Sequence, residues 1–188
     1  MTSIHTKFYP DGSLRYIEFK NIHGFHRPDG PSYQEWYTNG QLECQFYIIN
    51  DKLNNFLYTH TNLTIPAIQL WHSNGQPWTQ KYYINGKLND FFDKNTKQTI
   101  PSEQSWYNSG QRMTQQYRVN NKLNNFFDKN TNQTIPASQS WHNNGQLESQ
   151  EYYINNTRNN FFNHETNKTI PAYQSWYSNG QLVSQQYY

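Results

Sequence analysis

QSWYNSGQRM, residues 104–113, is one of five near copies of a single phrase in this chain. The other four copies are QEWYTNGQLE at 34–43, QLWHSNGQPW at 69–78, QSWHNNGQLE at 139–148 and QSWYSNGQLV at 174–183. Their tryptophans follow one another at intervals of 35 residues. A fixed period of this kind is the signature of a repeat protein, in which each unit buries its apolar face against its neighbours.

The repeat predicts a single domain at residues 8–188, preceded by an N-terminal tail at residues 1–7. Neither a linker nor a shift in composition divides that domain. It begins with a shorter unit at 8–35, where FYPDGSL takes the place of WYTNGQL. The full units follow at 36–70, 71–105, 106–140 and 141–175, and a partial unit ends the chain at 176–188. Partial end units are typical of the caps of repeat arrays.

The composition excludes several classes of protein. Only 34% of the 188 residues are hydrophobic, yet 18% are aromatic, so aromatic side chains must supply most of the burial. The net charge of +2 indicates no basic face for nucleic acid. Cys44 is the only cysteine, which rules out an internal disulfide and a cysteine-built zinc site. No apolar run is long enough to span a membrane. The first residues, MTSIHTKFYPDGS, lack a signal-peptide pattern, so we expect a cytoplasmic protein.

Each phrase predicts a β-hairpin. Asn39-Gly40 is the preferred central pair of a two-residue type I′ turn, and the other phrases have Asn-Gly or, once, Ser-Gly at the same place. This turn would place Trp36 opposite Glu43 and Gln34 opposite Gln45. The fold class we expect is therefore all-β: an elongated solenoid-like array of stacked β-hairpins with a 35-residue unit.

Side chains alternate between two faces along each strand. One face is nearly uniform from copy to copy, as expected where a residue packs on its counterpart in the next unit, so we place it inward. Its predicted core residues are Trp36, Trp71, Trp106, Trp141, Trp176, Tyr47, Tyr82, Tyr117, Tyr152 and Tyr187. The other face varies more and is placed outward. Its candidate partner-binding residues are Tyr37, His72, Tyr107, His142 and Tyr177.

The glutamine pairs fall on the predicted inward face. A buried amide without hydrogen bonds costs about 1–3 kcal/mol. Stacked identical glutamines can bond along the ladder, as amide side chains do in stacked sheets. Alternatively, the row is hydrated, and strand spacing does not decide between these two arrangements.

A parity argument constrains the rest of the unit. If every copy has the same orientation, an uninterrupted antiparallel meander needs an even number of strands per unit. The two strands beside each Asn-Gly satisfy this requirement. NGKLNDFFDKNTKQTIPS, residues 85–102, is therefore expected to be a crossing connection. Its Phe91-Phe92 pair, repeated as Phe126-Phe127 and Phe161-Phe162, is expected to close one edge of the core.

Two stretches, WYTNGQLECQFYIINDKLNNF at 36–56 and WHSNGQPWTQKYYINGKLNDF at 71–91, resemble the MORN-repeat variant found also in YwqK-type antitoxin-like proteins. HRPDGPSYQEWYTNGQL at 26–42 is similar to the version common in large DNA viruses of amoebae. The resemblance covers residues 8–188 and is weakest at FFDKNTNQTIP, which makes each unit longer than the family's. It implies a binding or scaffolding module without shared catalytic residues. It also implies an antitoxin role for some members, and the virion or host cytoplasm if the protein is viral.

The histidines are the main candidates for chemistry. His72 and His142 occupy the slot that is tyrosine in the other phrases, which favours a structural role. His23 and His26 lie near Asp29 and could suggest a metal or acid–base group, but they stand in a turn-rich stretch. The chain has no carboxylate pair, phosphate-binding glycine loop or nucleophile signature. We therefore predict no enzyme, no catalytic residues, no cofactor and no metal.

Three non-catalytic functions follow. The first is a repeat scaffold that holds a protein partner or serves as a structural component, since aromatic anchors carry much of the energy of protein interfaces. The second is a carbohydrate-binding module that uses exposed aromatic side chains. The third is an immunity protein that inhibits a toxin. Self-association through the end units is a further expectation, because exposed sheet edges can pair.

Overall fold

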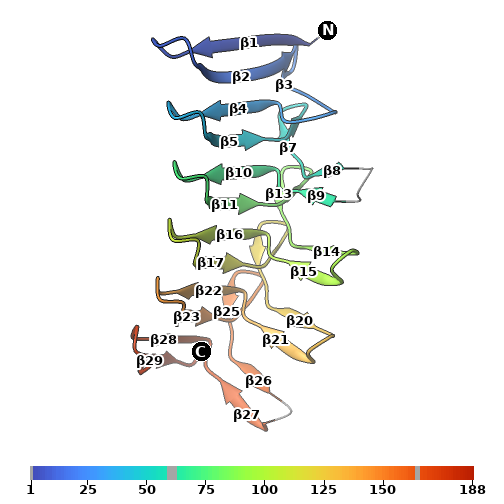
Figure 1. The fold of residues 1–188 in the computed structure, drawn as a ribbon. Helices are drawn as coiled ribbons and strands as arrows, with labels where there is room; N and C mark the ends of the chain where they lie inside the picture. Colours follow the sequence, from blue (N-terminus) through green and yellow to red (C-terminus); the bar gives the residue numbers. More distant parts are fainter. Residues whose placement is uncertain (1, 59–62, 164–165) are drawn as a thin grey trace.

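The computed structural model describes residues 2–58, 63–163 and 166–188, and the regular secondary structure in these residues is entirely β. The largest element is an antiparallel sheet of 13 strands. Its strands follow the order β1-β2-β4-β5-β10-β11-β16-β17-β22-β23-β28-β29, and β3 pairs with β2. Figure 1 shows these strands stacked one after another from the N-terminus to the C-terminus, like the rungs of a ladder.

The strands of this large sheet have the following bounds: β1 (Ser3–Phe8), β2 (Leu14–Asn21), β3 (Gly24–Phe25), β4 (Tyr33–Trp36), β5 (Leu42–Phe46), β10 (Ile68–Trp71), β11 (Pro77–Lys81), β16 (Glu103–Trp106), β17 (Arg112–Gln116), β22 (Ser138–Trp141), β23 (Leu147–Glu151), β28 (Tyr173–Trp176) and β29 (Leu182–Gln186). Strand β1 includes residues expected to form an N-terminal tail. The expectation was wrong because residues 3–8 pair with β2 and extend the sheet by one strand.

The prediction of two sheet strands for each phrase is confirmed. Gln34 lies opposite Gln45 in the first phrase, and the same pairing recurs in the other four. Between consecutive hairpins the register again joins glutamines, as in Gln45 with Gln69 and Gln115 with Gln139. One row of glutamines therefore crosses the sheet from β4 to β29.

The turn of each phrase differs from the predicted type I′ turn. Gly40 donates its N–H to the carbonyl of Tyr37, and Tyr37 donates to the carbonyl of Gln41, so three residues form the loop. Gly40 has φ of 82°, whereas Asn39 is not in the left-handed region. This is the three-residue hairpin loop, a type I turn followed by a left-handed glycine. The Asn39 side chain favours it by accepting the N–H of Gln41 at 3.0 Å.

The extra loop residue shifts the register near the turn. Trp36 pairs with Leu42, while Glu35 pairs with Cys44, so Glu43 is the additional residue of a β-bulge. The predicted pairing of Trp36 with Glu43 was therefore wrong by one position. The same bulge occurs in the other four phrases.

The connection between phrases is more ordered than we expected, because it contains two small hairpins. The first hairpin of each connection is here called the connector hairpin. The four connector hairpins are β6 (Ile48–Ile49) with β7 (Lys52–Leu53), β12 (Tyr83–Ile84) with β13 (Lys87–Leu88), β18 (Arg118–Val119) with β19 (Lys122–Leu123), and β24 (Tyr153–Ile154) with β25 (Thr157–Arg158). Their turns have two left-handed residues, such as Asn85 and Gly86 with φ of 52° and 77°. The type I′ turns predicted for the phrases therefore occur here instead.

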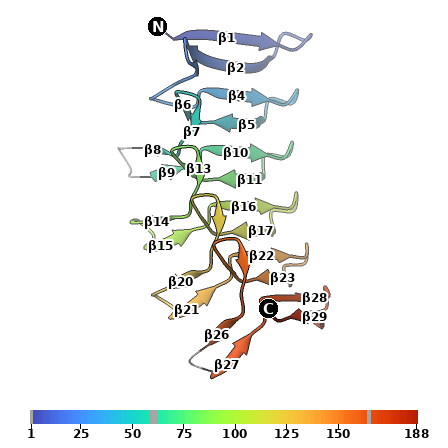
Figure 2. The ribbon, with the colours of Figure 1, turned by 180° about the vertical axis from the view of Figure 1, so that it is seen from behind.

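The second hairpin of each connection is here called the projecting hairpin. The four projecting hairpins are β8 (Phe56–Tyr58) with β9 (Leu63–Ile65), β14 (Phe91–Asp93) with β15 (Gln98–Ile100), β20 (Phe126–Asp128) with β21 (Gln133–Ile135), and β26 (Phe161–Asn163) with β27 (Lys168–Ile170). Each forms a separate two-stranded sheet. Figures 1 and 2 show them extending from the side of the ladder that is opposite the phrase turns.

Asparagines join consecutive connector hairpins. Gly86 donates its N–H to the carbonyl of Leu53, and Asn85 donates to Oδ1 of Asn54 at 2.7 Å. The next two units repeat both bonds with their own residues. This column of backbone and side-chain bonds is a second ladder beside the large sheet.

The most deeply buried part of the protein lies where the large sheet meets the projecting hairpins. Tyr47, Tyr82, Tyr117 and Tyr152 are only 6–7% exposed. They pack on Phe56, Phe91, Phe126 and Phe161, with ring centroids 4.7–5.6 Å apart. Burial raises the pKa of Tyr82 and Tyr117 to about 12. Ionisation of these phenols opposes folding, so their contribution to stability is lost as the pH rises from about 10 through 12.

Two sets of residues that were predicted to form the core lie outside its most buried part. The five phrase tryptophans are half-buried, because no second sheet of the described residues covers the large sheet at the end near the phrase turns (Figure 1). Tyr187 is 59% exposed, and no projecting hairpin among the described residues packs on it. In each phenylalanine pair, only the first ring packs against the tyrosine; Phe92 and Phe127 are exposed.

The small residue after each proline is the tightest position in the fold. Ala67, Ala137, Ala172, Ser32 and Ser102 are all 0% exposed. The carbonyl of Ala137 accepts the N–H of Tyr117, which directly follows the preceding phrase hairpin, at 2.8 Å, and the equivalent bonds recur along the chain. A residue beyond the size of serine has no space here.

Within the described residues there is no helix of the length and apolarity that crossing a membrane requires.

Asp90 provides a test of how closely consecutive units pack. Asn55, Asn125 and Asn160 occupy its place in the other units, and Asn125 accepts the N–H of Tyr153 at 2.9 Å from the next unit. Burial raises the pKa of Asp90 to about 6, above the value of about 3.9 in an unfolded chain. The folded state therefore favours the protonated acid, and this contribution to stability is lost as the pH rises from about 4 through 6.

We expect Asp90→Asn to raise the free energy of unfolding by about 1–2 kcal/mol at pH 7, after allowance for solvent screening, and by much less at pH 4. Urea unfolding at both pH values measures the difference. Asp128→Asn is the matched control, because Asn163 occupies the equivalent position in the next unit. A gain for Asp90→Asn that does not depend on pH would contradict the assignment.

Candidate binding face

Four of the five candidate partner-binding residues bond to the next hairpin. Tyr37 donates its hydroxyl to the backbone carbonyl of Trp71 at 2.8 Å, and Tyr107 donates to that of Trp141 at 2.9 Å. Tyr9, in the shorter first unit, donates to the carbonyl of Trp36 in the same way. One function of this side-chain row is therefore to fasten each hairpin to its successor.

The two histidines of the row make the same contact. Nε2 of His72 lies 3.1 Å from the carbonyl of Trp106, and Nε2 of His142 lies 2.9 Å from that of Trp176. A carbonyl oxygen only accepts, so Nε2 must carry a hydrogen in both residues. Histidine can replace tyrosine here because both present a donor at the end of a ring. This contact accounts for the alternation without a catalytic role.

The turn asparagines add a second bond between hairpins. Nδ2 of Asn39 donates to the carbonyl of Ser73 at 2.8 Å, and Asn74 and Asn144 donate in the same way to the next turn. Glutamines form a third set: Nε2 of Gln115 donates to Oε1 of Gln139 at 2.6 Å, and Gln45 donates to Gln69. The glutamine row is thus bonded along the ladder. The phrase recurs because its side chains bind neighbouring copies of the phrase.

Tyr107→Phe tests the fastening role. The substitution removes the hydroxyl that reaches Trp141 and keeps the ring, so we expect the free energy of unfolding to fall by about 0.5–1.5 kcal/mol. Tyr177→Phe is the control, because its hydroxyl makes no hydrogen bond to the residues the structure describes, and it is 57% exposed. Denaturant unfolding of both variants gives the comparison; equal losses would count against the role.

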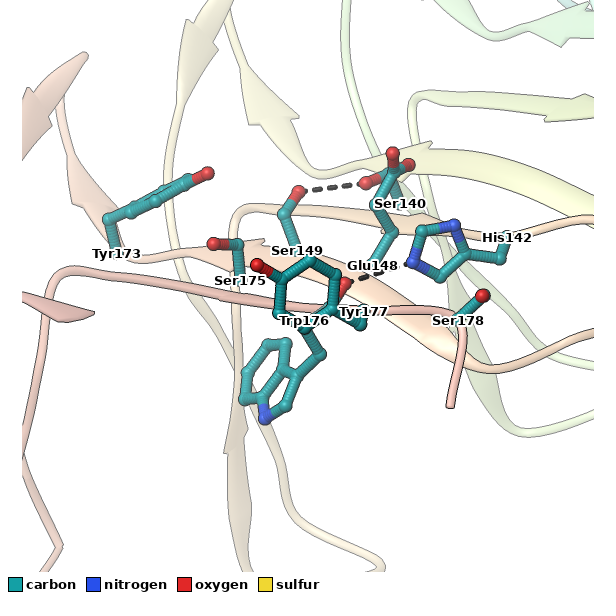
Figure 3. A pocket seen from close by; sticks show the side chains of 9 residues that line it. All are labelled: Ser140, His142, Glu148, Ser149, Tyr173, Ser175, Trp176, Tyr177 and Ser178. Carbon is teal, nitrogen blue, oxygen red and sulfur yellow. Dashed lines mark hydrogen bonds between the residues drawn. The ribbon is translucent and has the colours of Figure 1, made fainter. Parts of the chain in front are cut away.

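The bulge places a variable row on the same face as the tyrosines and histidines. This row is Glu43, Trp78, Met113, Glu148 and Val183. The predicted pairing of Trp36 with Glu43 would place this row on the tryptophan face, but the bulge moves each of these side chains to the opposite face. The rings of His72 and Trp78 accordingly lie 5.8 Å apart. Figure 3 likewise shows Glu148 beside His142, while the ring of Trp176 points away.

A cavity of about 460 Å³ opens on this face in the C-terminal half. It lies between the rings of His142 and Tyr177 on one side and Tyr173 on the other (Figure 3). Its remaining lining residues are Ser140, Glu148, Ser149, Ser175, Trp176 and Ser178. Volumes of about 300–1,000 Å³ are usual for small-ligand sites, although this one is shallow and open. We call this cavity, together with the variable row that contains Glu148, the binding groove.

Serines make the floor of the groove polar. Oγ of Ser140 lies 2.7 Å from Oγ of Ser149, and the Ser175–Ser184 pair repeats this contact at 2.9 Å. Glu148 is exposed and forms no ion pair with the described residues, whereas Glu151 is paired with Arg158 at 2.7 Å. The groove therefore offers hydroxyls, ring edges and one negative charge. The serines and Glu148 were not singled out in the sequence because the bulge that brings them together was not predicted.

The other histidine candidates do not form a site. His26 uses Nδ1 to accept the N–H of Asn50 at 3.3 Å, and His23 is exposed. In the described parts of the chain, no group of three or more His, Cys, Asp or Glu side chains could hold a metal ion. Cys44 is buried, and burial raises the pKa of its thiol to about 12, which leaves it protonated and unreactive at neutral pH.

The sequence model of a protein family, the MORN repeat variant, matches this chain at residues 137–155 and 172–188. The match supports a relationship to the MORN-repeat family. Each matched stretch contains one complete phrase hairpin, and neither contains a projecting hairpin. MORN repeats are generally non-catalytic modules that take part in interactions with proteins or membrane lipids. No curated protein and no solved structure matches the chain.

Proposed function

We propose that this protein is a non-catalytic repeat scaffold that holds a protein partner in the binding groove. The observation that carries the proposal is that different side chains of each phrase have different roles. The tyrosine, histidine, asparagine and glutamine side chains bind neighbouring units, whereas the bulge residues vary from copy to copy and face solvent or the groove. Variable side chains on a repeated framework are suited to recognition, as in other repeat arrays.

The partner we propose is a protein with polar or basic groups. Glu43 and Glu148 are the charged members of the variable row, and neither forms an ion pair with the described residues. A basic side chain of the partner would pair with Glu148, while Tyr177 and Tyr173 supply aromatic contact area at the two sides of the groove. A structural or immunity-type role would use the same surface, with a toxin as the partner in the latter case.

Site-specific photo-crosslinking tests the proposal. A photoreactive amino acid at position 148 should capture one stoichiometric protein from a lysate of the source organism. The same amino acid at position 119, which is exposed on a connector hairpin, should not capture it. Glu148→Lys should reduce capture by the photoreactive amino acid when it is placed nearby instead, at position 183. Equal capture from positions 148 and 119, or none from 148, would refute the proposal.

A carbohydrate ligand is the second candidate. Tyr173, Tyr177 and the serine floor of the 460 Å³ cavity combine ring faces with hydroxyls, as sugar recognition requires. A glycan array distinguishes this candidate, since sugar binding should be lost in Tyr177→Ala and kept in Tyr37→Ala. Tyr177 is exposed beside the cavity, while Tyr37 is half-buried in the N-terminal part of the sheet.

A further inference from the structure

One apolar side chain of each projecting hairpin points into solvent. Leu57, Phe92, Phe127 and Phe162 are 51%, 58%, 50% and 43% exposed. Each follows the phenylalanine that packs on a core tyrosine, so strand alternation directs it to the other side of its hairpin. A single exposed apolar residue is ordinary, but the same position exposed in four successive units forms a row. We call these four residues the apolar row.

Cavities lie along the apolar row. One of about 320 Å³ is lined by Leu57 and Phe92, the next of about 360 Å³ by Phe92 and Phe127, and a third of about 580 Å³ by Phe127 and Phe161. Each cavity thus lies between two consecutive projecting hairpins, which Figure 2 shows as separate blades. The blades are not joined into one sheet, so each space between them can receive a side chain from outside.

Lysines line the first two of these cavities. Lys94 lines the first cavity, and Lys97 and Lys129 line the second. Lys168 belongs to strand β27 of the last projecting hairpin. None of these four lysines forms an ion pair with the residues that the structure describes.

The two aspartates of the projecting hairpins are used internally. Oδ1 of Asp93 accepts the N–H of Asn95 at 3.0 Å, and its Oδ2 accepts the hydroxyl of Thr96 at 2.9 Å. Asp128 caps its own turn in the same way. The four lysines outnumber the two aspartates in the described parts of these hairpins, so the net charge there is positive and a complementary partner is acidic.

The spacing of the row selects the shape of the partner. Each unit contributes two strands to the large sheet, so consecutive units advance by about 9.6 Å. Seven residues of an α-helix rise by about 10.5 Å, so a helix can present one apolar side chain to each unit at every seventh position. We propose that the projecting hairpins bind an acidic amphipathic helix. Its heptad-spaced apolar side chains would enter the cavities beside Phe92, Phe127 and Leu57, and its carboxylates would pair with the lysines of these hairpins.

This site goes beyond the binding groove, because it uses different elements of the fold. The projecting hairpins lie in the segments that the MORN repeat variant does not match. Their ligand is acidic, whereas the groove, with Glu148, is suited to a basic one. The two sites can therefore be tested separately.

Fluorescence anisotropy with a labelled three-heptad helical peptide tests the proposal. The peptide carries leucine at every seventh position and glutamates beside it, and a second peptide has the same composition with leucine at every fifth position. We expect the full chain to bind the heptad peptide more tightly than the respaced one. We also expect binding to weaken with added salt, because lysine–glutamate pairs are screened.

Variants of the chain locate the site. Phe127→Ala should weaken binding of the heptad peptide by about tenfold, the loss expected for one buried anchor. The matched control is Ile154→Ala, which removes an equally exposed apolar side chain from a connector hairpin. Lys97→Gln with Lys129→Gln should weaken binding and flatten its salt dependence, while Lys122→Gln should do neither. Glu148→Lys should leave peptide binding unchanged, which separates this site from the groove.

Three results would overturn the proposal. They are equal affinity for the two peptides, binding that Phe127→Ala leaves unchanged, and binding only to anionic phospholipid vesicles in a parallel sedimentation assay. The last result would assign the row to a lipid surface. Circular dichroism and thermal melts of each variant establish that a loss of binding is not a loss of folding.

Discussion

Tyr117→Ala is expected to lower the free energy of unfolding by about 3–5 kcal/mol, the range found when a large buried aromatic side chain is removed. Tyr117 is 7% exposed, and its ring centroid lies 5.4 Å from that of Phe126. Its N–H also donates to the carbonyl of Ala137, directly before the next phrase hairpin. Removing the ring would leave a cavity between the large sheet and a projecting hairpin, in the middle of the array. Denaturant unfolding followed by tryptophan fluorescence measures the loss.

The chain contains its own control for this substitution. Tyr187 occupies the same place in the last hairpin, but it is 59% exposed because no projecting hairpin covers it. We expect Tyr187→Ala to change the free energy of unfolding by no more than about 0.5 kcal/mol, as is usual at the surface. Similar losses for the two variants would mean that the tyrosines do not form the core.

Ala137→Leu is the second substitution with a large expected effect. Ala137 is 0% exposed, and its backbone lies between Tyr117 of one unit and the next hairpin. A leucine side chain has no space there, so consecutive units would have to move apart. We expect a loss of about 3 kcal/mol, at the upper end of the range for overpacked cores. Thermal melts would also lose cooperativity if the array separates at this junction.

Ala137→Ser is the control, because Ser102 and Ser32 occupy the equivalent position in other units with 0% exposure. Ser102 donates its hydroxyl to the carbonyl of Gln116 at 2.8 Å, so a serine at 137 is expected to find a similar acceptor. We expect a change within about 1 kcal/mol. If leucine were tolerated as well as serine, the close approach of the units would be disproved.

The sheet was predictable because its rules are local and general. The alternation of side chains along strands led to the glutamine pairs, such as Gln34 with Gln45, and these pairs occur as predicted. Parity led to two sheet strands per phrase, which is also correct. Both arguments hold for any antiparallel meander and need no knowledge of what packs on the sheet.

The turn type could not be assigned in the same way. Asn-Gly fits a type I′ turn as well as the observed three-residue loop with a left-handed glycine. The Asn39 side chain, which bonds to its own turn and to Ser73 of the next, favours the second. That partner atom belongs to a neighbouring unit, and the sequence of one hairpin does not reveal it. The error moved the bulge residues to the wrong face, and with them Glu148.

The same limitation affected the candidate site. Tyr37, Tyr107, His72 and His142 appeared available for a partner because their alternation on one face is visible in the sequence. Their acceptors are backbone carbonyls of the next hairpin, which carry no sequence signal. The projecting hairpins were missed for a different reason, because their strands are only three residues long. The adjacent phenylalanines, Phe126 and Phe127, were the available signal, since strand alternation requires one of the two to face outward.

The central claim is that each phrase hairpin is completed by hydrogen bonds to the chain at the start of the hairpin that follows it. Backbone amide hydrogen exchange, measured by NMR, tests this most directly at the tyrosine that recurs at the same position of successive repeats. The N–H of Tyr117 donates to Ala137 and that of Tyr152 donates to Ala172, whereas Tyr187 has no following unit among the described residues. The account predicts that the amides of Tyr117 and Tyr152 exchange only through unfolding of the array, while that of Tyr187 exchanges rapidly. Equal and rapid exchange at all three positions would show that the hairpins do not bind one another in this way.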